Sequence, residues 1–250
     1  MEKTYITKRQ FFTIIFAYVL SNEYTRGMYM VAYKQSTWIP LLLAIPLSCF
    51  LFFIYSFIYK NNDYPDFKTA MEKILGKFFS KFFFFIYLIY FLFLMYLTFR
   101  DVGEVVKIYI MQDSPILVVY AGFLLAALYS ANKGIEVLGR YAGISFFITF
   151  VSFVFFYVLL IIVNEPDFNN FLPFLPNGFK PLIDPTLKMA YSIPLGELFV
   201  MLVIFQYVKP EQKKKAFKTS YIGIITIGIT LLIITVSNII FLEAETLVFG

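Results

Sequence analysis

Long apolar runs constrain the fold of this chain more than any other feature. A window of about 19 residues, which is long enough to cross a bilayer as a helix, finds seven of them. They lie at residues 10–30, 37–59, 82–110, 115–131, 141–163, 186–208 and 219–242. The sequence therefore predicts an all-α polytopic membrane protein with a single transmembrane domain over residues 1–250.

Composition agrees with this class and excludes several functions. Charged residues make up 15% of the chain and hydrophobic residues 60%, whereas a soluble domain carries about a quarter charged residues. The chain has no histidine and one cysteine, Cys49, so imidazole ligands and an intrachain disulfide are excluded. We find no metal cluster, no activated nucleophile and no phosphate-binding loop in the sequence, and we expect neither an enzyme nor a cofactor.

The basic residues predict the orientation in the membrane. Most of the 21 Lys and Arg residues fall in residues 1–9, 60–81, 133–140 and 209–218, which lie on one side if the seven runs alternate. The positive-inside rule then predicts a cytoplasmic N-terminus. Contacts between these loops and anionic lipid headgroups account for the net charge of +5, so no nucleic-acid partner is expected.

Two of the apolar runs are interrupted by polar residues and a carboxylate. The first run contains Leu20-Ser21-Asn22-Glu23-Tyr24-Thr25-Arg26-Gly27, and the sixth contains Tyr191-Ser192-Ile193-Pro194-Leu195-Gly196-Glu197. Both carboxylates fall at mid-membrane depth. Interrupted helices in matching positions of two halves are typical of a transporter-like binding site.

Glu197 is the leading site candidate. An ionised carboxylate at the bilayer centre is costly, so its side chain should face a cavity, a partner or a proton. Pro194 and Gly196 weaken the helix beside it and free backbone groups to bind a ligand. The alternative is a structural acid that accepts hydrogen bonds from the free N–H groups of its own broken helix.

Glu23 has two interpretations as well. Arg26 lies three residues on, so the two side chains form a local ion pair or Glu23 contacts a ligand. The hydroxyl, amide and backbone groups around it are of the kind that holds a small zwitterion. The full set of candidate ligand-binding residues is Ser21, Asn22, Glu23, Thr25, Gly27, Tyr96, Tyr191, Ser192, Pro194, Gly196 and Glu197.

Three further segments carry weaker expectations. Arg100, Asp101 and Glu104 form either an external gate or a solvated helix end, and we favour the solvated end because charges prefer water. Residues 60–81 predict a turn, a short interfacial helix and a break at Gly76. Five prolines in residues 164–185 exclude a continuous helix there and favour an external loop or lid.

The chain resembles the B subunits of endospore germinant receptors, the spore germination permeases of the amino acid–polyamine–organocation transporter superfamily. The resemblance spans essentially the whole chain and depends on the order and spacing of several short features. They are Ser36-Thr37-Trp38-Ile39, Tyr64-Pro65-Asp66 to Ile74-Leu75-Gly76-Lys77, Gly134-Ile135-Glu136 with Arg140, Pro173-Phe174-Leu175-Pro176-Asn177-Gly178 to Pro181, and Pro194 with Glu197.

The resemblance implies an inverted-repeat transporter-like fold of ten helices, in which the first and sixth helices are broken around a substrate. The first repeat would be residues 1–163 and the second, incomplete, residues 186–250. We therefore expect a chain truncated after seven of ten helices.

The function that the resemblance implies is a nutrient receptor of the spore inner membrane. It would bind a small nutrient such as an amino acid and would work with the A and C receptor subunits. The alternative is a proton- or sodium-coupled amino-acid transporter.

Overall fold

The computed structural model describes residues 5–26, 34–61, 66–173, 175, 178–191 and 199–241. The regular elements of these residues are helices, and their one β contact is an isolated bridge between Ile6 and Val208. The α-helices are α1 (Lys8–Arg26), α3 (Trp38–Asn61), α4 (Phe67–Tyr109), α5 (Ile116–Lys133), α6 (Ile135–Val163), α7 (Ile183–Tyr191), α8 (Phe199–Phe205) and α9 (Lys213–Phe241). The 3₁₀ turns are η1 (Lys34–Ser36), η2 (Phe168–Phe171), η3 (Lys180–Leu182) and η5 (Pro210–Gln212).

The predicted all-helical membrane class is confirmed. Within the described ranges, five helical segments are long and apolar enough to cross a membrane. They are Trp38–Ile58 of α3, the long helices α4, α5 and α6, and Pro210–Phe241, which contains α9. The division of the chain into seven spans stays a prediction.

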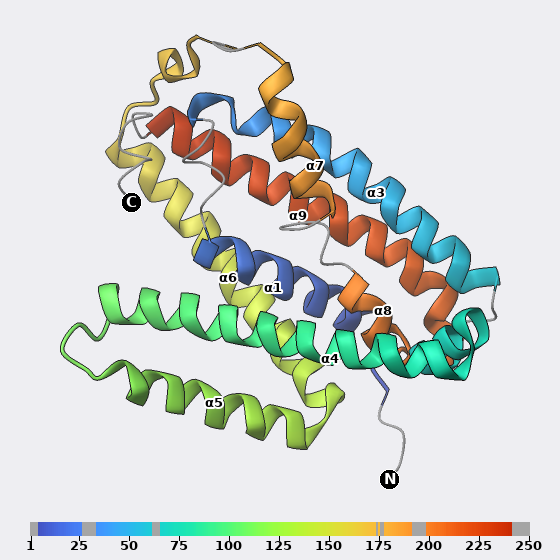
Figure 1. Ribbon diagram of the computed structural model, residues 1–250. Coiled ribbons are helices and arrows are strands. Elements are labelled where there is room, and N and C mark those ends of the chain that lie inside the picture. The colour runs from blue at the N-terminus through green and yellow to red at the C-terminus, as the bar shows by residue number, and fades with distance from the viewer. Residues whose placement is uncertain are drawn as a thin grey trace.

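The core forms around α1 and α9. Helix α1 packs against α9 on one side and α6 on the other, and α3 packs against both α9 and α7 (Figure 1). Phe11, Ile15 and Val19 of α1 and Ile224 and Ile227 of α9 are almost completely buried. In lipid, apolar surface alone does not favour one helix face over another, so close packing must hold these helices together.

Small residues on α9 permit that packing. A Cβ atom added to Gly228 would lie 2.5 Å from Cγ1 of Ile45, so α3 crosses α9 where only a glycine fits. Five residues earlier, Gly223 faces Phe12 and Ile15 of α1 at ordinary van der Waals distance. The two glycines thus allow α9 to approach two different helices, α3 and α1, which is the usual role of small residues between membrane helices.

Backbone hydrogen bonds join different segments of the chain at the two ends of the packed helices. At one end the N–H of Ile6 donates to the carbonyl of Tyr207 (2.8 Å), and the N–H of Lys209 donates to the carbonyl of Ile6 (3.0 Å). At the other end the N–H of Asp167 donates to the carbonyl of Ile240 (3.1 Å). The start of the chain and the basic segment after α8 therefore lie at one end, which agrees with the predicted alternation of spans. Which end faces the cytoplasm stays a prediction.

Helix α4 shows the break predicted at Gly76. Asp66 caps the helix by accepting from the N–H of Thr69 (3.3 Å), and the helix is interrupted at Gly76 with φ 76° and ψ 164°. A positive φ of this kind favours glycine. The proline-rich segment also forms short turns, as expected, but α7 begins at Ile183, slightly earlier than predicted. Pro185 fits the first turn of α7 because no helical hydrogen bond is needed there.

Helices α4 and α5 form a hairpin that extends from the core (Figure 1). Phe78, Phe82 and Phe85 of α4 are more than half exposed. The accessible surface is 15568 Å² for 29.2 kDa, against about 11,500 Å² expected for a soluble protein of this mass. So much apolar surface requires lipid or other protein to cover it.

The α3–α9 crossing provides a stability test. Gly228→Leu would force a side chain into Ile45 and should lower the free energy of unfolding by about 1–3 kcal/mol, the usual cost of overpacking. Gly122→Leu on α5 is the matched control, because a Cβ atom at Gly122 meets nothing within 4 Å. Melting temperatures of the two variants in nanodiscs would check this, and equal stability would contradict the crossing.

Candidate functional site

Most of the predicted ligand-binding residues lie at or beyond the edge of the described structure. Ser21, Asn22, Glu23 and Thr25 belong to the last turns of α1, whose backbone is helical through Arg26, but their side chains are outside the description. The same holds for the side chain of Tyr191, the last residue of α7. Gly27, Ser192, Pro194, Gly196 and Glu197 lie outside the described residues.

These bounds define what the structure says about the two interruptions. Any unwinding of the first span begins after Arg26, because α1 is regular up to that residue. In the sixth span α7 ends at Tyr191 and α8 begins at Phe199, with the Pro194–Glu197 segment between them. Tyr96 lies on α4 and is 60% exposed, and its role stays a prediction.

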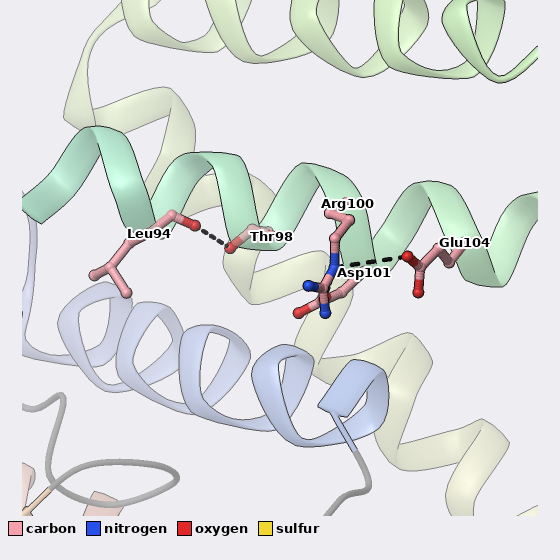
Figure 2. Close-up of polar contacts among 5 residues, drawn as sticks. All are labelled: Leu94, Thr98, Arg100, Asp101 and Glu104. Atoms are coloured by element: carbon pink, nitrogen blue, oxygen red, sulfur yellow. Dashed lines mark hydrogen bonds and ion pairs between the residues drawn. The ribbon is translucent and has the colours of Figure 1, made fainter.

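A buried carboxylate on α4 is the clearest polar feature of the described membrane helices. Asp101 is only 6% exposed, and its Oδ1 accepts from Nη2 (3.0 Å) and Nε (3.2 Å) of Arg100. Glu104, one turn further along, lies 3.6 Å from the same Nε. Figure 2 shows the three side chains on the side of α4 that faces α1, near the end of α1 where its last turns lie.

Asp101 corrects the expectation that this segment is a solvated helix end. Helix α4 continues to Tyr109, and α5 packs back against it where the Gly103 position meets the ring of Tyr120. The Asp101 carboxylate lies on the opposite side, which faces α1, and is covered there (Figure 2), while Arg100 (40% exposed) and Glu104 (55% exposed) keep access to their surroundings. The end of α4 at Tyr109 agrees with the predicted end of the third run at residue 110, so only the solvation of Asp101 was wrong.

The cluster has a definite chemical capacity. It carries one positive and two negative charges, so it favours a cation or an ammonium group over an anion. Asp101 fixes the guanidinium of Arg100, which still presents further N–H donors. Paired ionisable groups inside a membrane segment commonly mark a binding or ion pathway.

A separate cavity of about 570 Å³ lies between α1, α6 and α8. Its floor consists of core residues, among them Ile14, Leu20, Ala142 and Met201. Four residues that carry a hydroxyl group are also among its lining residues, namely Tyr18, Tyr141, Ser145 and Thr149. Sequence reasoning missed the part that α6 contributes, although Tyr141, Ser145 and Thr149 recur every fourth residue along α6 and are the signal that could have indicated its cavity side.

Among the described residues, no group of three or more His, Cys, Asp or Glu side chains lies close enough together to hold a metal ion.

Comparisons with known proteins point to spore germination. A family model described as "Spore germination protein" matches residues 5–249. Spore germination protein KB of Bacillus subtilis (strain 168) is 29% identical over 245 residues, which is 98% of this chain and 65% of the relative. Spore germination protein A2 of the same organism is 26% identical over 210 residues, covering 84% of this chain and 56% of the relative.

A further relative is more distant. Spore germination protein YndE of Bacillus subtilis (strain 168) is 24% identical over 186 residues, covering 74% of this chain and 50% of the relative. The chain thus spans between half and two thirds of the length of these relatives. No solved structure matches the chain.

The Arg100–Asp101 pair yields a stability prediction. Arg100→Gln should lower the free energy of unfolding by on the order of 2 kcal/mol, less than the about 3–5 kcal/mol lost by fully buried pairs, because Arg100 is partly exposed. Arg140→Gln is the matched control: its pair with Glu136 is exposed, and such pairs contribute at most about 1 kcal/mol. Thermal unfolding in nanodiscs measures both. Equal melting temperatures for Arg100→Gln and Arg140→Gln would mean that the Arg100–Asp101 pair does not stabilise the helix.

Proposed function

The chain belongs to the spore germination protein family, and on that premise we propose that it is a nutrient germinant receptor subunit of the spore inner membrane. It binds a small nutrient, such as an amino acid, in a transporter-like cavity and thereby triggers germination. The observation that carries this proposal is the family match over residues 5–249, which includes every described helix.

The proposed architecture is an inverted repeat. The first repeat comprises residues 1–163 and the second begins at residue 186, with the first and sixth helices broken around the ligand. One observation supports it: the N-terminal segment meets the basic segment after α8 at one end of the structure. We propose that this end is cytoplasmic, as the positive-inside rule favours.

The proposed ligand site lies between the last turns of α1 and the segment from Tyr191 to Glu197. Glu197 would accept a hydrogen bond or ion pair from the ligand, and the polar groups near Glu23 would hold its other end. The buried Asp101 supports this location, because its carboxylate, paired with Arg100, lies near the last turns of α1 (Figure 2). A zwitterionic nutrient offers both charges that such a site can bind.

Receptor A and C subunits are the proposed partners. Ligand binding would favour one of two helix arrangements, and closure of the loop at residues 164–185 would accompany it. The partner subunits would sense that change. Germination proteins KB and A2 among the relatives support a role in germination for this chain.

Spore germination is the first test. Spores that lack the gene should lose the response to one nutrient class in a panel of amino acids, sugars and nucleosides. The complete gene should restore that response, whereas Glu197→Gln should raise the half-saturating nutrient concentration at least tenfold because the ligand loses a charged partner. Glu165→Gln, the same change at an exposed loop position, is the control and should behave as the wild type.

Measuring nutrient flux distinguishes the receptor from the alternative, a proton- or sodium-coupled amino-acid transporter. Carboxylates inside membrane segments are consistent with ion coupling as well as with ligand binding. In proteoliposomes, we expect saturable binding of the labelled nutrient without accumulation along an ion gradient. Accumulation that is lost with Glu197→Gln would support the transporter in place of the receptor.

A further inference from the structure

We propose that the cavity between α1, α6 and α8 receives the apolar side chain of the nutrient, so that the germinant is an amino acid with an aliphatic or aromatic side chain. The inference rests on the proposed function and makes it more specific. It also adds α6, a helix that the sequence did not implicate, to the binding site.

The position of the cavity connects it to the proposed polar site. Ala17 and Leu20 line it from the middle of α1, and Ser21, the first candidate ligand residue, follows directly. Met201 and Ile204 line it from α8, a few residues after Glu197. Both helices that adjoin the two interruptions thus contribute to one hollow. A ligand whose charged groups sit at the interruptions can extend its side chain into it.

The lining selects by polarity. Among the described residues that line the cavity there is no Asp, Glu, Lys or Arg, so a charged side chain in this part of the cavity would be buried without a counterion, which is unfavourable. A sugar or nucleoside carries many hydroxyl groups, and most of them would lose water without gaining partners. An aliphatic or aromatic side chain gains by leaving water and needs no such partner.

The size and depth of the cavity fit a small molecule. Its volume of about 570 Å³ lies within the range of about 300–1,000 Å³ typical of ligand sites. Ala142 and Met201 on its floor belong to the buried core, whereas Tyr141 at its rim is 68% exposed. The hollow therefore reaches from the surface into the core, unlike the flat apolar faces of α4 and α5.

The first experiment is a nutrient panel on spores in which the complete gene, with its partner subunits, is the only germinant receptor. We expect a response to amino acids such as leucine, phenylalanine or valine, and none to lysine, glutamate, glucose or inosine. A response limited to sugars, nucleosides or charged amino acids would overturn the inference while leaving the receptor function intact. A response to no nutrient would contradict the proposed function itself.

Two variants that fill the cavity locate the side-chain site. Ala142→Leu and Ser145→Leu each add bulk from α6, so the half-saturating concentration of leucine or phenylalanine should rise at least tenfold. That of alanine, whose side chain is small, should rise less than threefold, which also shows that the variants fold. Ala127→Leu, the same substitution at an exposed position of α5, is the matched control and should change neither value.

Equal effects on large and small amino acids, or no effect from either filling variant, would overturn the assignment. The second outcome would mean that a lipid chain or another helix occupies the hollow. Ligand-induced thermal stabilisation of the purified wild-type protein provides an independent readout: leucine or phenylalanine should raise the melting temperature, and glucose and lysine should not. Stabilisation by glucose alone would likewise reject the proposal.

Discussion

Close packing of α1 against α6 and α9 is the interaction on which the rest of the structure depends. In a bilayer the lipid tails are as apolar as the side chains, so burial of carbon does not hold helices together as it does in water. Helix α1 is held by close contacts with glycines of its neighbours. Phe12 and Ile15 pack against Gly223 of α9, and Gln10 packs against Gly139 of α6. These contacts fix α1 along its first half. Its last turns, which carry the proposed ligand residues, extend beyond them toward α4.

The sequence predicted those features that have a local physical cause. Apolar runs predict helices because a backbone in lipid must satisfy its own hydrogen bonds, and the break at Gly76 follows from a backbone conformation that favours glycine. The solvated end expected at Asp101 was wrong because its burial is tertiary: the carboxylate lies on the side of α4 that faces α1, and nothing within the charged segment indicates that neighbour. The cavity could not be predicted either. Three helices form it, and the spaced Tyr141, Ser145 and Thr149 of α6 do not by themselves indicate which other helices lie beside them.

The charged cluster and the cavity lie at different depths along α1 and have opposite chemistry. Asp101 and Arg100 lie near its last turns, whereas the apolar hollow borders its middle, up to Leu20. The cost of burying charge keeps such features apart, since a carboxylate in the hollow would lack a partner. A ligand that satisfies both must be amphipathic, with its charged groups together at one end. An α-amino acid with an apolar side chain has this form, and a sugar does not.

The contacts that hold α7 and the segment after α8 are relevant to how ligand binding would produce a signal. Helix α7 is held to α3, where the hydroxyl of Ser48 donates to the carbonyl of Ala190 (3.3 Å). The segment after α8 is held to the start of α1 by the backbone bonds between Ile6 and residues 207–209. The two halves of the proposed sixth span are therefore attached to different parts of the structure, α7 to α3 and the segment after α8 to the start of α1. A ligand that draws them together would shift α1 and α8 relative to α3 and α7, a hinge of the kind that two-state proteins use. The α3–α9 crossing at Gly228 is already as close as a glycine allows, so such a motion could not bring α3 nearer to α9.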